Sequence, residues 1–224
     1  MTTRVIIPWR DQPDRRAAAA WVEDRLRRHG HAPMRGEVGA HEPWSKGAAV
    51  AHALGEPTSV DEVVVVHDAD VWSDGLHDAI LAVVGGRFHW AVPHRTVRRL
   101  DADETTRVLG LAWPPRANRL ERHAYTGVMG GGIVVIRRAL YDEAPFDRRF
   151  IGWGQEDVAA GATWRALGGA PWRGNATLWH LHHEPEPKLT SAIGSRESQL
   201  LCRRYVRAAQ RRDTVELRSI IKEA

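Results

Sequence analysis

Two aspartates follow a run of four valines. Val63–Val66 leads into His67, and Asp68 and Asp70 come next with one small residue between them. Such a valine run is typical of a strand buried on both faces, so we expect the strand to end at His67 and the carboxylates to lie just beyond its carboxyl end. Facing carboxylates repel each other unless a cation lies between them. The spacing favours a divalent metal site completed by phosphate oxygens; the alternative is a solvated turn.

Three histidines lie within four positions near a second strand end. His180, His182 and His183 follow or close a strand expected to end at Leu181. Imidazole nitrogens are common ligands of transition metals. If the chain turns there, His180 and His183 reach one ion and His182 points elsewhere; the alternative is a polar loop that is rich in histidine by chance.

A third cluster of chemistry-bearing residues stands at a helix start. Glu156 and Asp157 come directly after the sequence Gly152-Trp153-Gly154, and helical spacing of apolar residues follows them. The helix dipole favours ionised carboxylates at this end. The functional interpretation is a general base with a tryptophan beside it that stacks on substrate, and the structural alternative is helix capping.

Cations and glycines stand near other strand ends. We expect Ser45 and Ser73 to cap the helices over 45–54 and 73–84. Lys46 would lie in the first turn of the helix over 45–54, where backbone N–H groups already favour anions. Arg10 follows a first strand that we expect Pro8 to end, and either cation can meet a phosphate or simply be solvated. Gly131 and Gly132 precede the apolar run 133–136, which indicates a close approach of the backbone to another group.

The elements that position these residues alternate along the chain. We expect strands near residues 5–7, 34–38, 63–67, 88–93, 133–136 and 178–181. Helices are expected over 13–29, 45–54, 73–84, 103–111, 138–144 and 156–167, with one or two more over 195–223. Residues 95–124 form the least regular stretch. This alternation predicts an α/β protein with a mixed, mainly parallel central sheet flanked by helices.

Composition narrows the class of protein. The 224 residues are 43% hydrophobic and 27% charged, the ordinary balance of a globular chain, with a net charge of +4. The single cysteine excludes an internal disulfide and suits a reducing compartment. No signal peptide or membrane-spanning run is apparent. We therefore expect a cytoplasmic protein without a membrane span, and we do not expect nucleic acid as its partner.

In their order along residues 4 to 185, these pieces resemble the metal-dependent glycosyltransferases of the GT-A fold. The opening Val-Ile-Ile-Pro-Trp-Arg is similar to the nucleotide-binding start of that family, and His67-Asp68-Ala69-Asp70 to its Asp-x-Asp strand end. The most specific piece runs from Gly131-Gly132-Ile133 to Trp153-Gly154-Gln155-Glu156-Asp157. It resembles the carboxyl-terminal motif of β-1,4-galactosyltransferases and polypeptide N-acetylgalactosaminyltransferases.

The resemblance implies a Rossmann-like GT-A domain over residues 1–190 and a helical extension over 191–224. It implies a UDP-sugar donor, Mn²⁺ or Mg²⁺ as cofactor, and an acceptor hydroxyl on a glycan, protein or small molecule. The metal ligands would be Asp70, His180 and His183, and the base of an inverting transfer would be Asp157. Glu156 would assist catalysis and, with Trp153, contact the acceptor or the sugar. The donor would lie against Pro8, Trp9, Arg10, Lys46, Asp68, Asp70, Gly131 and Gly132.

Two features depart from the family pattern, and two alternatives stay open. Val158 stands where the galactosyltransferases continue with acidic residues, and we do not expect their membrane anchor and disulfides in this chain. One alternative is another metal-dependent nucleotide-sugar enzyme, such as a nucleotidyltransferase, although its usual glycine-rich first loop is replaced by Pro8-Trp9-Arg10. The other is a non-enzymatic basic binding module, which would leave the acidic residues and histidines without a purpose.

Overall fold

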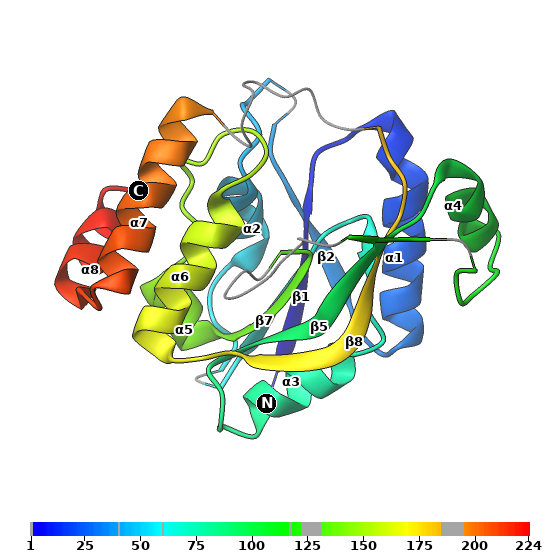
Figure 1. The fold of residues 1–224 in the computed structure, drawn as a ribbon. Coiled ribbons are helices and arrows are strands. Elements are labelled where there is room, and N and C mark those ends of the chain that lie inside the picture. Colours follow the sequence, from blue (N-terminus) through cyan, green and yellow to red (C-terminus); the bar gives the residue numbers. More distant parts are fainter. Residues whose placement is uncertain (1, 40, 60, 117, 122–130, 185–194) are drawn as a thin grey trace.

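A computed structural model describes residues 2–39, 41–59, 61–116, 118–121, 131–184 and 195–224. In this part of the chain an 8-stranded sheet runs through the centre, with helices on both of its faces (Figure 1). The strands pair in the order β2-β1-β3-β7-β5-β8-β4, and β6 pairs with β5 outside this path. The strands are β1 (Thr3–Trp9), β2 (Pro33–Glu37), β3 (Val63–His67), β4 (Val71–Trp72), β5 (Trp90–Arg99), β6 (Arg119–Glu121), β7 (Ile133–Arg137) and β8 (Trp172–His180).

The sheet is mixed, as the sequence predicts. Strands β1, β2, β3, β5 and β8 run in one direction, and β7 lies antiparallel between β3 and β5. Because β3 and β8 point the same way, the loops after His67 and after His180 lie at the same edge of the sheet, where open α/β sheets bind their ligands.

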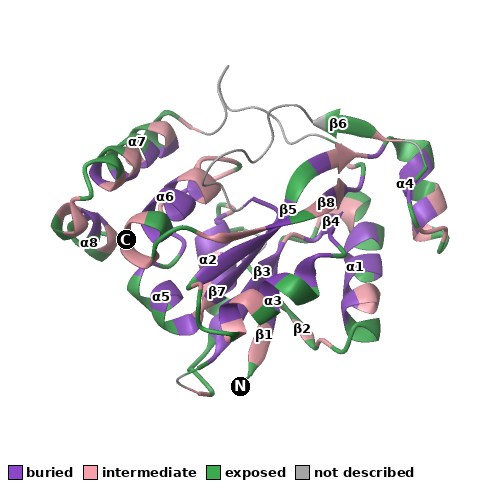
Figure 2. Cartoon of the chain, turned by 60° about the horizontal axis from the view of Figure 1, so that its bottom comes forward, coloured by how far each residue is buried: buried purple, intermediate pink, exposed green. Residues whose placement is uncertain are grey.

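The helices cover the two faces through alternate residues of the same strands. Val63 and Val65 face a core formed with α1 and α3, whereas Val64 and Val66 face α2, α5 and α6. The valine run is therefore buried on both sides, which Figure 2 shows for the central strands. The helices are α1 (Arg16–Arg28), α2 (Lys46–Leu54), α3 (Leu76–Val84), α4 (Ala102–Leu109), α5 (Arg138–Glu143), α6 (Glu156–Gly168), α7 (Arg196–Gln210) and α8 (Thr214–Lys222), and a short 3₁₀ helix (Pro13–Arg15) precedes α1.

Most predicted boundaries hold within a few residues, but four differ. Strand β8 begins at Trp172 and not near residue 178, because it pairs with β5 from Ala91 onward. Pro8 does not end the first strand: β1 continues to Trp9, because beyond Ile6 it pairs with β2 alone and a missing N–H is tolerated. Ser73 does not cap α3, which begins after Gly75; the Ser73 hydroxyl accepts from the Gly75 N–H in a turn instead. Strand β5 begins at Trp90 and runs through Pro93 to Arg99, into the stretch expected to be irregular.

The two C-terminal helices pack on α6. Tyr205 and Leu217 share a small core with Phe150 and Ala159, so the extension is attached to the helix that begins at Glu156 (Figure 1). The predicted domain boundary at 190/191 falls outside the described residues and stays a prediction. In the described part of the chain no helix has the length and apolarity needed to cross a bilayer, and the cytoplasmic location likewise stays a prediction.

Candidate functional site

The short strand β4 brings Asp70 to His180. Val71 pairs with His180 in an antiparallel bridge, and the Leu181 N–H donates to the Asp70 carbonyl at 2.8 Å. These backbone bonds close the loop after β3 onto the end of β8. The sequence analysis did not anticipate this two-residue strand, because so short a run carries no periodic pattern.

Asp70, His180 and His183 form a group of three metal-ligating side chains. One ligand atom of each lies within 4.8 Å of the other two, and the His183 Nε2 lies 3.2 Å from Asp70 Oδ2. Neighbouring ligands of an octahedral ion with bonds of about 2.1 Å are about 3 Å apart, so this spacing fits a divalent cation. His182 is not a member of this group, and its backbone N–H donates to Thr105 Oγ1.

Hydrogen bonds orient both imidazoles for binding a metal. His180 Nδ1 lies 2.8 Å from the Leu181 carbonyl and His183 Nδ1 lies 2.7 Å from the Glu184 carbonyl. A proton on His180 Nδ1 satisfies the Leu181 carbonyl and leaves the Nε2 lone pair for a ligand bond, which is the usual arrangement around protein-bound metals. His183 Nδ1 lies near both the Glu184 carbonyl and the Arg15 guanidinium. Burial lowers the pKa of His180, and the charge of Asp70 opposes this shift.

The carboxylate of Asp70 stays ionised although it is buried. Burial acts to raise its pKa, but His180, His183 and Arg15 outweigh this and hold the pKa below its ordinary value. Arg15 lies 3.9 Å from Asp70 Oδ2 and 3.1 Å from His183 Nδ1. Arg15 could not be predicted as a site residue from the sequence, because an arginine just before a helix belongs to no recognisable motif.

A second cluster joins Lys46 to Asp68 and Asp157. The buried Lys46 ammonium lies 2.9 Å from Asp68 Oδ1 and 3.0 Å from Asp157 Oδ1. Burial acts to lower the pKa of Lys46, but Asp157, Asp68 and Glu156 raise it well above its ordinary value. The lysine predicted to meet a phosphate therefore bridges the two aspartates.

Backbone packing fixes the distance between α2 and α6. Ser45 caps α2, as predicted, by accepting from the Ala48 N–H, and its hydroxyl donates to the Arg148 carbonyl. A Cβ on Gly47 would lie 2.5 Å from the Phe146 carbonyl, so only glycine permits this approach. The Gly152 N–H also donates to the backbone carbonyl of Trp44. These contacts place Lys46 opposite the start of α6.

Glu156 and Asp157 have different environments although they are neighbours. Glu156 is 8% exposed and its Oε2 has no hydrogen-bond partner among the described residues. Burial, then the charge of Asp157, raises the pKa of Glu156 to about 7. Asp68 resembles it: burial raises its pKa to about 6, with Lys46 opposing. A buried carboxyl whose pKa is raised toward neutral pH can donate a hydrogen bond when it holds its proton.

The loop before α6 presents Trp153 to solvent. Its side chain is 51% exposed, and the flanking Gly152 and Gly154 have positive φ angles of 82° and 99°. Gln155, which precedes Glu156, also has a positive φ, 80°, which is uncommon for a residue with a side chain. This conformation leaves an aromatic face open beside the carboxylates.

The remaining predicted donor residues take different positions. Gly132 has φ +83°, and its carbonyl accepts a hydrogen bond from the Asp68 N–H at 2.8 Å. The backbone at Gly131 and Gly132 therefore supports the loop that carries Asp68. Pro8 and Arg10 stand at the carboxyl end of β1, and Arg10 is exposed. The side chain of Trp9 is 3% exposed and lies under the guanidinium of Arg35, so it packs as part of the hydrophobic core.

The fold and the site together define this chain as an α/β protein. It carries a group of candidate metal ligands and paired carboxylates at one edge of its sheet. No protein-family model matches the chain, and no curated protein matches it. Solved structures do. The catalytic domain of Drosophila β1,4-galactosyltransferase 7 in complex with xylobiose has a TM-score of 0.59 and 15% identity, covering 90% of this chain and 79% of that chain.

A mutant of the same Drosophila enzyme, in complex with manganese, UDP-Gal and xylobiose, has a TM-score of 0.61 and 15% identity, covering 89% of this chain and 78% of that one. The chain therefore has the GT-A glycosyltransferase fold, and the fold predicted from the sequence is confirmed.

Proposed function

We propose that this protein is a metal-dependent glycosyltransferase that moves a sugar from a UDP-sugar to an acceptor hydroxyl. The observation that carries the proposal is the convergence of two clusters at one edge of the sheet: Asp70, His180 and His183 within ligand distance of one another, and Asp157 held by Lys46 beside Asp68. The neighbour that binds manganese and UDP-Gal has the same fold.

Asp70, His180 and His183 would hold Mn²⁺, which accepts both carboxylate and imidazole ligands more readily than Mg²⁺ does. A divalent cation neutralises the charge that develops on the departing diphosphate. Arg15, next to Asp70, adds a second positive charge at the same place. Pro8 and Arg10 would contact the nucleoside, and Asp68 would face its ribose or the sugar.

Asp157 would act as the base of an inverting transfer. The acceptor oxygen forms a bond to the anomeric carbon while the bond from that carbon to the diphosphate oxygen breaks, and UDP leaves with the electron pair. The proton of the acceptor hydroxyl passes to the Asp157 carboxylate. Lys46 keeps this carboxylate in place through its 3.0 Å contact.

Glu156 and Trp153 would bind the sugar or the acceptor. With a pKa near 7, Glu156 is largely protonated in slightly acidic solution and can donate a hydrogen bond to a sugar hydroxyl. The exposed indole of Trp153 offers an apolar face to a pyranose ring. Val158 follows Asp157, so this helix start carries two acidic residues.

Sugar transfer with the variant Asp157→Asn tests the proposal. The native chain should release UDP from a UDP-sugar in an acceptor-dependent reaction that EDTA abolishes, with an inverted product anomer by NMR. Loss of the base should lower kcat by about 10²- to 10⁴-fold with little change in donor affinity. A product with retained configuration would remove Asp157 from the role of base.

The same assay separates the alternatives. A nucleotidyltransferase would release pyrophosphate from a nucleoside triphosphate, whereas a transferase releases UDP from a UDP-sugar. A basic binding module would turn over neither substrate, and Asp70→Asn would leave its behaviour unchanged.

A further inference from the structure

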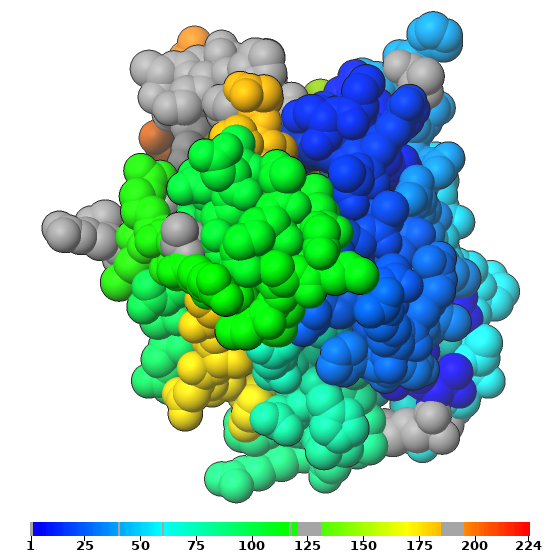
Figure 3. All heavy atoms as spheres, turned by 90° about the vertical axis from the view of Figure 1, so that its right-hand side faces the viewer, coloured from blue at the N-terminus to red at the C-terminus, as the bar shows by residue number. Residues whose placement is uncertain are grey.

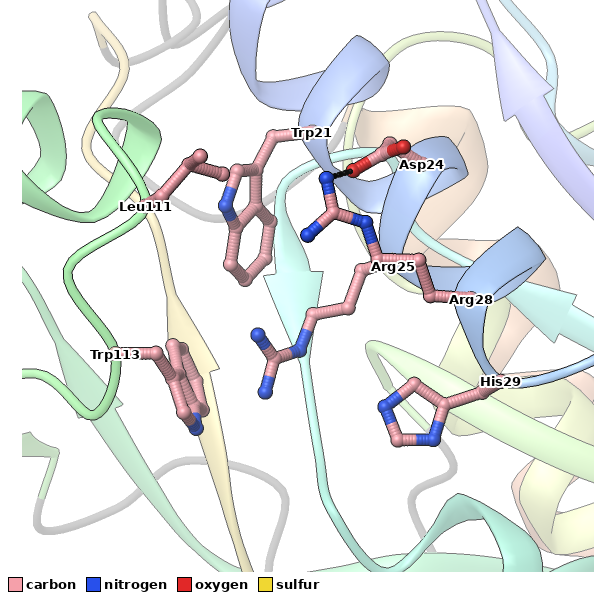
Figure 4. A pocket seen from close by; sticks show the side chains of 7 residues that line it. All are labelled: Trp21, Asp24, Arg25, Arg28, His29, Leu111 and Trp113. Atoms are coloured by element: carbon pink, nitrogen blue, oxygen red, sulfur yellow. Dashed lines mark ion pairs between the residues drawn. The ribbon is translucent and has the colours of Figure 1, made fainter.

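A surface pocket lies between α1 and the segment that follows α4, beside the indole of Trp72, and none of its lining residues belongs to the two clusters. It has a volume of about 140 Å³ and is lined by Trp21, Asp24, Arg25, Arg28, His29, Leu111 and Trp113. Figure 3 shows the face on which the segment around α4 covers α1, and Figure 4 shows the lining side chains. A cavity of about 150 Å³ holds one benzene ring, so this surface pocket has room for one six-membered ring whose substituents extend into solvent.

Tryptophan rings form the walls. The centroids of Trp21 and Trp113 are 5.6 Å apart with a tilt of 38°, and Trp72 closes the base behind Trp21. Indole rings present broad apolar faces that pack on the C–H face of a pyranose. These walls favour a ring-shaped ligand with at least one apolar face.

Arg25 supplies the charge in this pocket. Its guanidinium carbon lies 4.1 Å from the ring centroid of Trp113 and 4.8 Å from that of Trp72, and it points between the indoles (Figure 4). Its Nε is buried and has no hydrogen-bond partner among the described residues, and its ion pair with Asp74 is long, at 3.6 Å. Burial lowers the pKa of Arg25, which reflects the lost hydration.

A guanidinium in this state has unused capacity for an anion. Its planar set of five donors matches the two oxygens of a carboxylate, and donors that lack both water and a partner are costly. Arg28 differs because it is already paired with Asp24 at 2.6 Å. Because the ion pair with Asp74 is long, a carboxylate that enters the pocket would pair more closely with Arg25 than Asp74 does.

The rim carries a leucine in an unusual conformation. Leu111 lies just after α4 and its C-cap Gly110. Its backbone has φ +73° and its side chain is 67% exposed. Glycine is the common residue with a left-handed backbone just after a helix. A leucine here places an apolar side chain over the pocket mouth, where it can cover a bound ring.

We propose that this pocket binds a pyranose carboxylate, the chemistry of a hexuronate unit, with its carboxylate on Arg25 and its ring between Trp21 and Leu111. This site is separate from the metal group and needs no nucleotide. Its choice of a saccharide is in keeping with the proposed function, but its binding is measured without turnover, so the two stand or fall independently.

Ligand-observed NMR titration with glucuronate tests the site, without metal or nucleotide, on the full chain. Saturable binding is expected, with glucose, acetate and inorganic phosphate each weaker by about tenfold or more, because each lacks either the ring or the carboxylate. Equal binding of phosphate would replace the proposal by a general anion site. Absence of saturable glucuronate binding to folded protein would overturn it.

Variants locate the ligand. Arg25→Gln should abolish the preference for glucuronate over glucose. Since Arg25 also packs on tryptophans, a second pair avoids the core: Leu111→Glu should repel the carboxylate and lower affinity by about tenfold, whereas Leu111→Gln should lower it much less. Equal affinities of the Glu and Gln variants would show that the carboxylate binds elsewhere.

Discussion

At the scale of single residues, the site is governed by which buried charges are paired. Lys46 is the cation between Asp68 and Asp157, and the structure gives it contacts of 2.9 and 3.0 Å. Removing one member of a buried ion pair leaves the other charge without compensation, which costs more than the pair itself contributes. The lysine thus contributes to stability as well as to the placement of the proposed base.

Lys46→Met should lower the free energy of unfolding by about 3–5 kcal/mol near pH 8. The loss should be smaller near pH 5, where Asp68 and Glu156, with pKa values raised to about 6 and about 7, are protonated and repel less. Guanidinium denaturation at both pH values measures this. The exposed Lys222→Met is the control, and an equal loss in that variant would contradict the account.

Glu156 gives stability a pH dependence of known sign. Its pKa is raised from 4.5 to about 7 by burial, so between these values the folded chain holds a proton that the unfolded chain has released. The free energy of unfolding therefore falls as pH rises through this window. At 1.36 kcal/mol per pKa unit the change is of the order of 3 kcal/mol.

Glu156→Gln should remove the part of this decline near pH 7 and be the more stable variant above pH 7, whereas Asp68, with its pKa raised to about 6, keeps a decline at lower pH. Thermal or denaturant unfolding from pH 4.5 to 8 checks it, with the exposed Glu56→Gln as control. A native slope that Glu156→Gln leaves unchanged would place the titrating group elsewhere.

At the scale of elements, the site depends on how strand ends are held together. Gly132 shows this: its carbonyl fixes the Asp68 N–H, and a Cβ at this position would lie 2.5 Å from Leu178 Cδ2. Gly30 has nearly the same φ, +81° against +83°, but a Cβ there would meet no atom within 4 Å. Alanine at Gly30 would therefore cause backbone strain alone, whereas alanine at Gly132 would add steric overlap.

Gly30→Ala should lower the free energy of unfolding by about 1–2 kcal/mol, because alanine is unfavourable in the left-handed conformation. Gly132→Ala should cost more, because Leu178 must also move, and it should weaken UDP binding by displacing the loop of Asp68. Paired unfolding curves and nucleotide titrations measure both effects. Equal costs with unchanged binding would show that Gly132 does not support the loop.

Much of this element structure could be predicted because long patterns specify it. The valine run, the apolar periodicity of α1 and α6, and the Ser45 cap all appear where the sequence places them. Lengths of short elements could not be predicted: β4 has two residues and depends on backbone bonds to β8. Arg15 and the Lys46 bridge arise from contacts between distant segments, which no local pattern records.

At the scale of the whole molecule, one edge of a mixed sheet gathers residues from opposite ends of the chain. Arg15 precedes the first long helix and His183 follows the last strand, yet their side chains lie 3.1 Å apart. The sheet topology brings the ends of β3 and β8 to this edge, and the chain shares its fold with the Drosophila enzyme at 15% identity. We therefore propose that this edge binds a UDP-sugar through a metal.

The most direct test is the thermal stability of the protein with UDP, measured with Mn²⁺ and with EDTA. At 100 times its dissociation constant UDP should add about 2.7 kcal/mol of stability in Mn²⁺ and much less in EDTA. Asp70→Asn should lose this increment while Asp61→Asn, an exposed control, retains it. A UDP effect that is the same with EDTA, or that persists in Asp70→Asn, would contradict the account.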